Sequence, residues 1–362
     1  MGPMPWWLVL YLRQPLATQA GIEILKRGGN AADAAVAVEP GSTGIGGDAF
    51  CLFYDAKTRT VKGLNGSGRT PANLTMDFLK NKAKLSDQNE FTRSVHSITV
   101  PGAAAAWLWL VCSYVKNSGK EKTFRLLAKS GKKGFYEGRI GEAIVEAVQT
   151  RGGVMTLKDL ANHTSELLDP ISLDYHDWTV WEIPPNGQGI TTLIALGIIE
   201  ALEEEGVVDF KKLDHNSAEY IHIISEALRI AFADTRHYVT DPQVQHVPTE
   251  NLLSKEYLRQ RAKLIDLKQR NNEVQKGYPD EIGNTSHVIA KSTGVVLHNR
   301  GGNFVLIDGH PNCLGPSKRP YHTIIPSMIT RKTENGHALE ACFGGTFLNS
   351  IQVNCMPLLL FS

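Results

Sequence analysis

The chain has 362 residues, of which 42% are hydrophobic and 21% charged, and its formal net charge at pH 7 is +1. Such a composition is typical of a globular protein long enough to bury a large core in one or two domains. The near-neutral charge argues against a nucleic-acid partner. The five cysteines are scattered and include no CxxC pair, which argues against a zinc site or a disulfide framework.

Two apolar stretches resemble targeting segments, at residues 4–12 and 355–361. Each is far shorter than the ~20 residues that cross a bilayer. The first also has no basic region and no small-residue cleavage site before Arg13. The sequence therefore indicates neither a membrane anchor nor a secretory signal, and a cytoplasmic location is favoured.

Helical spacing predicts two helices near the start of the chain, over residues 16–27 and 30–38, separated by Gly28-Gly29. A glycine-rich loop follows at residues 39–50. It does not match the dinucleotide pattern GxGxxG, and no P-loop lysine follows it. We therefore expect a tight loop that brings backbone close to a neighbouring segment, and not a phosphate site.

Alternating apolar residues predict pairs of strands joined by turns over residues 50–66 and 171–185. A helix is predicted over 142–150, and the longest helix over 216–239. Asn216 is predicted to cap that helix, with Glu219 completing a capping box. Its predicted apolar stripe contains Tyr220, Ile221, Ile224, Leu228, Ala231 and Phe232.

The last part of the chain contains short apolar segments that predict strands. These segments are residues 286–290, 294–299, 303–308, 323–330 and 338–343. His310, Cys313 and His322 lie in a proline-containing loop, and their spacing matches no common zinc pattern. Helices that flank antiparallel-looking strands favour a layered α+β arrangement.

Thr285 stands just before one of these strands, and two interpretations are open. Threonine at the start of a strand is common, and Asn284-Thr285-Ser286 also matches a glycosylation sequon. Alternatively, the Thr285 hydroxyl could attack the carbonyl of Asn284. Hydrolysis would then leave Thr285 with a free α-amine, whose pKa of about 7.7–8.0 makes it a base near neutrality. Nucleophile and base would reside in one residue.

Long stretches of the sequence resemble the γ-glutamyltranspeptidase (glutathione hydrolase) family, most closely its YwrD-like branch. They include QPLATQAGIEILKRGGNAADAAVAV, EPGSTGIGGDAFCLFYD, HSITVPGAAAAW and GHPNCLGPSKRPYHTIIPSM. The resemblance implies an N-terminal-nucleophile hydrolase of the α+β class, with an αββα sandwich that is incomplete in this chain. It also implies self-cleavage before Thr285, which would divide the chain into a large-subunit region, 1–284, and a truncated small-subunit region, 285–362.

The resemblance further implies that Thr285 attacks the γ-glutamyl amide of glutathione or a similar compound. The γ-glutamyl group would then pass to water or to an amino acid. The backbone N–H groups of Gly344 and Gly345 would stabilise the oxyanion, each by roughly 3–4 kcal/mol. No cofactor and no metal is implied. The implied partners are a small-molecule substrate and, after cleavage, the large and small subunits for each other.

The residues expected to recognise the substrate match the family less closely. A glutamyl α-carboxylate favours a guanidinium partner, and Arg69 offers one two positions away from the family's register. Asn303 stands where the family has an acidic residue for the α-amine. His322 and Thr323 replace a pair of serines. These differences leave the preference for a γ-glutamyl group open.

Compared with the family, the chain lacks segments after residues 38, 107 and 290, and it ends soon after Gly345. The missing segment after residue 290 would contain a threonine and an asparagine that assist the nucleophile. Losing a strand there would leave backbone groups unpaired. Two alternatives therefore stand beside the enzyme: a non-catalytic relative that keeps the scaffold for binding, and an acylase that acts on other amides.

Overall fold

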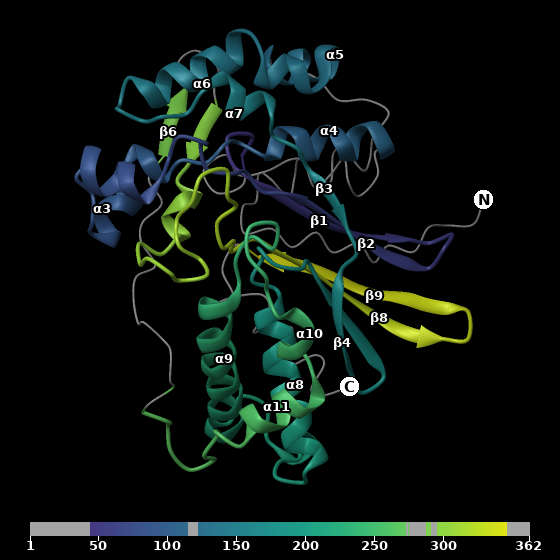
Figure 1. Ribbon diagram of the computed structural model, residues 1–362. Helices are drawn as coiled ribbons and strands as arrows, with labels where there is room; N and C mark the ends of the chain where they lie inside the picture. Colours follow the sequence, from purple (N-terminus) through teal and green to yellow (C-terminus); the bar gives the residue numbers. More distant parts are fainter. Residues whose placement is uncertain (1–43, 115–121, 273, 275–286, 291–294, 346–362) are drawn as a thin grey trace.

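The computed structural model describes residues 44–114, 122–272, 274, 287–290 and 295–345 (Figure 1). The helices predicted at 16–27 and 30–38 lie outside these residues, as do Asn284 and Thr285.

The described strands form three antiparallel sheets. The strand orders are β1-β2-β3, β4-β5-β8-β9 and β6-β7. The strands are β1 (Ala49–Asp55), β2 (Thr60–Gly66), β3 (Glu166–Leu168), β4 (Ile171–Tyr175), β5 (Trp178–Glu182), β6 (His287–Ala290), β7 (Val295–His298), β8 (Ile325–Thr333) and β9 (Gly336–Gly345). Burial alternates along β4, as in a half-buried strand, whereas every residue of β1 is partly buried.

Helices cover the sheets on two sides, which gives the αββα sandwich expected from the sequence. In Figure 1 one group lies at the top and the other at the bottom, with the strands between them. The upper helices are α4 (Ala103–Tyr114), α5 (Lys122–Tyr136), α6 (Arg139–Gln149) and α7 (Leu157–Ala161). The lower helices are α8 (Ile190–Glu204), α9 (Ala218–Tyr238), α10 (Thr249–Leu252) and α11 (Lys255–Ala262). The short helix α3 (Gln88–Arg93) lies to one side.

The largest apolar core lies between the lower helices and the four-stranded sheet. Helix α8 is buried almost all round, including Leu196 and Ile198, because α9, α11 and β4 pack around it. Gly197 permits the close approach of α11, since a Cβ there would lie 2.5 Å from the Leu258 side chain. A second core, formed mainly by α4, α5 and α6, lies under the upper helices.

Helix α9 confirms the long helix predicted from the sequence, but its cap and its buried face differ from the prediction. The N-cap is Ser217, whose hydroxyl accepts a hydrogen bond from Tyr220 N at 3.2 Å. Asn216 is not the cap because its backbone is left-handed, with φ of 63°. Ile221 is 51% exposed, whereas Ile223 and other residues on the adjoining face are buried.

The segment 303–308 is not the strand that its apolar residues predicted. It forms a loop with one isolated bridge, between Val305 and Cys313. Val305 N donates to Asn312 O at 3.0 Å, and the Asn312 side chain donates to Asn303 O at 2.8 Å. These donors and acceptors form hydrogen bonds with one another inside the loop, so the segment does not have to pair with a neighbouring strand. The other predicted strands and the helix at 142–150 are confirmed.

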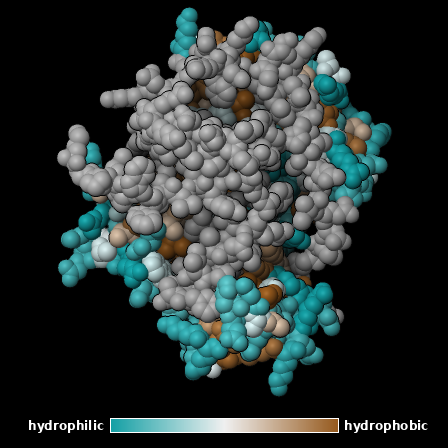
Figure 2. Space-filling model, turned by 180° about the vertical axis from the view of Figure 1, so that it is seen from behind, coloured by the Kyte–Doolittle hydropathy of each residue, from teal (hydrophilic) through white to brown (hydrophobic). Residues whose placement is uncertain are grey.

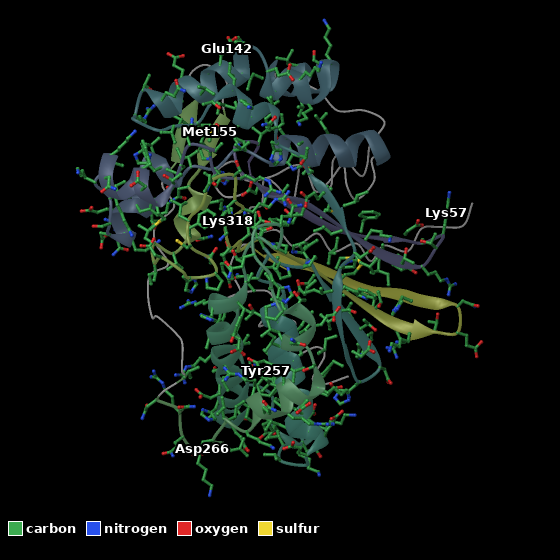
Figure 3. The ribbon with its side chains drawn as sticks, in the orientation of Figure 1. Lys57, Glu142, Met155, Tyr257, Asp266 and Lys318 are labelled. Carbon is green, nitrogen blue, oxygen red and sulfur yellow. The ribbon has the colours of Figure 1, made fainter. Side chains whose placement is uncertain are left out.

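The surface seen from behind is mainly hydrophilic where described atoms are visible, with small apolar patches between them (Figure 2). None of the described helices combines the length and the apolar character that a membrane span requires. In the side-chain view, Lys318 lies near the centre of the molecule, whereas Glu142 and Asp266 mark opposite ends (Figure 3).

Candidate active site

Gly344 and Gly345 are the last two residues of β9. They lie opposite Pro326 and Ile325, at the end of the β8–β9 ladder that is away from the hairpin turn. The backbone of both glycines is therefore fixed by the residues that open β8.

The strand that begins two residues after Thr285 is fixed by the glycine-rich loop. His287 lies opposite His298 in the β6–β7 ladder, and His298 N donates to Gly46 O at 3.2 Å. A Cβ on Gly47 would lie 2.2 Å from the His298 ring, so only glycine fits this contact. Within the described part of the loop, the expected close backbone approach is confirmed.

Asp48 and His322 form a buried pair that joins this loop to β8. His322 is fully buried, and its Nε2 lies 2.8 Å from Asp48 Oδ2. Its Nδ1 accepts from Ile324 N at 3.1 Å, which assigns the proton to Nε2. Burial lowers the pKa of His322, so the ring is neutral at pH 7. Burial alone would raise the pKa of Asp48, but hydrogen bonds from His322 and Gly68 outweigh it and lower that pKa.

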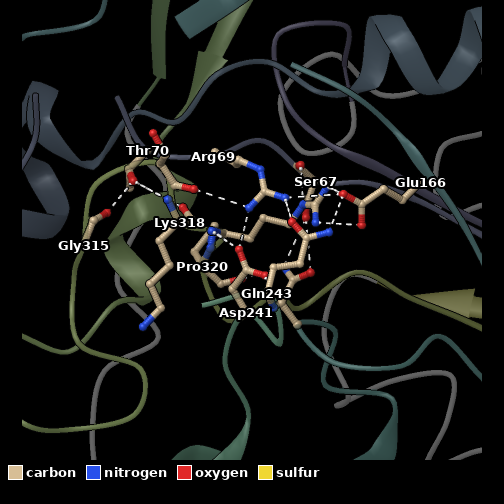
Figure 4. Close-up of polar contacts among 12 residues, drawn as sticks. Ser67, Arg69, Thr70, Glu166, Asp241, Gln243, Gly315, Lys318 and Pro320 are labelled. Atoms are coloured by element: carbon tan, nitrogen blue, oxygen red, sulfur yellow. Dashed lines mark hydrogen bonds and ion pairs between the residues drawn. The ribbon is translucent and has the colours of Figure 1, made fainter. Parts of the chain in front are cut away.

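Arg69 follows Gly68 in the chain, and its guanidinium is bound by side chains of the protein itself (Figure 4). Its Nη1 donates to Asp241 Oδ2 at 2.7 Å, and its Nη2 to Gln243 Oε1. A longer contact of 3.4 Å joins Nη2 to Glu166 Oε1. The Arg69 side chain is 23% exposed, whereas Asp241 is fully buried.

Arg319 completes the same network from the opposite side. Its guanidinium binds both carboxylate oxygens of Glu166, at 2.7 and 3.0 Å, and is only 2% exposed. Its backbone N–H donates to Asp241 Oδ2 at 2.9 Å. Burial opposes ionisation of Glu166, but the bonds from Arg319 outweigh it and lower the pKa of that carboxyl.

Asn303 and Thr323, two of the residues expected to bind the substrate, each form a hydrogen bond within the protein. The Asn303 amide donates to Tyr321 O at 2.9 Å. Thr323 Oγ1 accepts from Arg300 Nη1 at 3.4 Å, and the Arg300 side chain is buried. Within the described residues, no cluster of His, Cys, Asp or Glu side chains is arranged to hold a metal ion.

The structure thus brings together several residues that the sequence singled out. Arg69 adjoins Gly68, whose N–H donates to Asp48 at 2.7 Å, and Asp48 binds His322. Sequence reasoning did not select Asp48, Glu166, Asp241 or Arg319. The sequence offered only weak signals for two of them: Asp48 lies in the glycine-rich loop, directly after Gly46-Gly47, and Arg319 lies within the KRP of a matching segment.

Comparison with known proteins places the chain in a family. The family model described as Gamma-glutamyltranspeptidase matches residues 17–121, 111–289 and 282–356. The glutathione hydrolase-like YwrD proenzyme of Bacillus subtilis is 32% identical over 403 residues, covering 87% of this chain and 75% of its own. The glutathione hydrolase proenzyme of Escherichia coli is 26% identical and covers 87% of this chain and 71% of its own.

Among solved structures, a cephalosporin acylase from Bacillus halodurans is similar, with a TM-score of 0.72 and 32% sequence identity. That match covers 90% of this chain and 74% of the acylase. The chain belongs to the γ-glutamyltranspeptidase family and has its N-terminal-nucleophile hydrolase fold. The alignment of 403 residues with the B. subtilis relative exceeds the 362 residues of the chain, so that relative contains residues that this chain lacks.

Proposed function

We propose that the chain is the proenzyme of a γ-glutamyltransferase, or glutathione hydrolase, that cleaves itself between Asn284 and Thr285. The products would be a large subunit, 1–284, and a small subunit, 285–362, that stay together. The processed enzyme transfers the γ-glutamyl group of glutathione or its conjugates to water or to amino acids. Family membership supports this proposal, and so do the names of the relatives.

The observation that carries the proposal is a chain of contacts between the two ends of the candidate site. His287, just after the nucleophile position, is paired with His298, which binds the glycine loop at Gly46. Two residues further on, Asp48 binds His322. His322 in turn binds the N–H of Ile324, and the next residue lies opposite Gly345. Short contacts therefore link the strand after Thr285 to the proposed oxyanion donors.

In the proposed reaction, the free α-amine of Thr285 takes the hydroxyl proton as the oxygen attacks the amide carbon. The negative charge that develops on the carbonyl oxygen is stabilised by the N–H groups of Gly344 and Gly345. The amide C–N bond then breaks as the Thr285 ammonium gives its proton to the leaving amine, and a γ-glutamyl ester remains on the Thr285 oxygen. Water or an amino-acid amine attacks this ester, takes the acyl group and returns the proton to the Thr285 hydroxyl. Arg69, Asn303 and Thr323 are the proposed contacts for the glutamyl group. His322, whose ring nitrogens both bind within the protein, contributes by holding Thr323 in place.

Self-cleavage is tested by expressing the chain in bacteria and analysing the purified protein by denaturing electrophoresis and N-terminal sequencing. We expect two fragments, the smaller beginning at Thr285. Thr285→Ala should stay uncut, Thr285→Ser should still be cut, and Ser286→Ala is the matched control that should be cut like the parent. A soluble protein that stays uncut and releases no chromophore from a γ-glutamyl anilide would refute the proposal and favour a non-catalytic scaffold.

A second candidate function is an acylase that acts on other amides. One observation favours it: the guanidinium of Arg69 is already paired with Asp241, so it is less available to a substrate carboxylate. The similarity to a cephalosporin acylase points the same way. A panel of acyl anilides separates the candidates, because the acylase should turn over neutral acyl groups far faster than γ-glutamyl.

A further inference from the structure

We propose that Asp241 is a specificity-determining residue that competes with the substrate α-carboxylate for Arg69. The inference rests on the proposed function and deepens it, since it concerns which acyl groups the same site accepts. In the family comparison Arg69 drew attention as a guanidinium for the substrate, whereas Asp241 carried no expectation. The structure joins the two side chains at 2.7 Å.

The first step of the argument is the occupancy of the guanidinium. A carboxylate binds arginine best through two parallel N–H groups, and every such mode uses at least one terminal nitrogen. In Arg69, Nη1 donates to Asp241 and to Ser317 O at 3.3 Å. Nη2 donates to Gln243 and contacts Glu166. A substrate carboxylate would have to displace one of these partners.

The second step is the fixed position of Asp241. Its Oδ2 also accepts from Arg319 N, and its Oδ1 accepts from Gln243 N at 3.1 Å. The side chain is fully buried. Glu166 is the weaker competitor, because it lies 3.4 Å from Arg69 and binds Arg319 with both oxygens. Asp241 therefore cannot swing away without breaking several hydrogen bonds.

The third step is the charge balance of the network. Arg69 and Arg319 carry two positive charges, and Asp241 and Glu166 carry two negative charges. A neutral network has no excess charge to attract an anion. An α-carboxylate on the acyl group should therefore improve binding little, and acyl groups with and without it should be accepted almost equally.

The test compares two substrates that differ only in the α-carboxylate: γ-glutamyl anilide and 4-aminobutyryl anilide. With the parent enzyme we expect kcat/KM values within about threefold of each other. Asp241→Asn keeps a hydrogen-bond acceptor but gives the network a net positive charge. It should raise the preference for the γ-glutamyl substrate about tenfold, mainly through a lower KM, because charge-assisted bonds contribute most to binding.

The controls separate this effect from a general loss of an ion pair. Asp174→Asn breaks an exposed pair with Lys332 and should leave the preference unchanged. Adding Arg69→Met to Asp241→Asn should abolish the gain. If Asp241→Asn does not fold, Glu166→Gln provides the same change in charge and should give a gain in the same direction.

A binding measurement keeps the test independent of turnover. Calorimetry on uncut Thr285→Ala protein compares L-glutamate with 4-aminobutyrate, and Asp241→Asn in that background should increase the glutamate preference about tenfold. An unchanged preference in the folded Asp241→Asn protein would overturn the inference. So would a strong preference for glutamate in the parent that Arg69→Met removes. Failure of self-cleavage would count against the proposed function alone.

Discussion

The lower apolar core and a cluster of charged side chains near the candidate site, called the polar junction, are stabilised by different interactions. We define the polar junction as Asp48, Arg69, Glu166, Asp241, Arg319 and His322. The lower core around α8 is stabilised by apolar area removed from water, a force that has no direction. The junction depends on charged hydrogen bonds with defined partners. The core can therefore absorb small changes of shape, whereas the junction fixes the positions of individual atoms next to the candidate site.

The largest expected effect comes from removing one charge of the junction. Arg319→Met leaves Glu166 without its bidentate partner, so we expect the free energy of unfolding to fall by about 3–5 kcal/mol. Urea denaturation measures the change. The matched control is Arg331→Met, which breaks an exposed pair with Glu340 and should cost about 1 kcal/mol or less. Similar losses of unfolding free energy in Arg319→Met and Arg331→Met would show that the buried ion pair stabilises the protein no more than an exposed pair does.

The apolar core should respond to a cavity. Leu196→Ala removes part of a fully buried side chain on α8 and should lower the free energy of unfolding by about 3 kcal/mol. The control is Val244→Ala at an exposed position, which should change it by no more than about 0.5 kcal/mol. The loss for Leu196→Ala should be the same at low and high salt, because the substitution removes no charge.

Acid should weaken the region that adjoins the junction. Burial lowers the pKa of His163 to about 4, from a reference value of about 6.5 in the unfolded chain. The unfolded state therefore binds more protons between these two pH values, and stability falls as the pH drops through this window. The contribution is about 3 kcal/mol in total, since one pKa unit corresponds to about 1.4 kcal/mol. His163→Leu should flatten this part of the stability profile, whereas His246→Leu, on the surface, should not.

The smallest effect should come from a surface ion pair. Lys332 and Asp174 lie 2.5 Å apart, but both side chains are more than half exposed. Solvent screens such pairs, so Lys332→Met should change the free energy of unfolding by less than about 1 kcal/mol. A larger loss of unfolding free energy would indicate that ion pairing stabilises the edge of the four-stranded sheet, as it stabilises the polar junction.

Much of the fold could be predicted because local pattern and tertiary packing agree. The strands β1, β2, β4 and β5 and the helix α9 stand where alternation and helical spacing predicted them. The prediction was wrong where two local signals compete. Asn216 and Ser217 are both good cap residues, and only backbone geometry selects the serine. The segment 303–308 has a strand-like composition, but its loop satisfies its own backbone.

The candidate site was predicted only in part, for a different reason. Arg69 and His322 stand in segments that resemble the family, so a single sequence was enough to select them. Their partners Asp241 and Asp48 are 172 and 274 residues away along the chain. No local periodicity indicates pairs so distant in sequence. The roles of Thr285, Gly344 and Gly345 stay predictions until the processing and activity experiments are done.

The pairing of β5 with β8 has a consequence for any protein cut before Thr285. Residues 178–182 of β5 form a continuous antiparallel ladder with residues 327–331 of β8. The same sheet therefore contains strands from both sides of the proposed cut. Neither piece can leave without exposing an unpaired strand edge. A severed chain should therefore elute as a single particle under gentle conditions, and its pieces should come apart only when the whole sheet is unfolded.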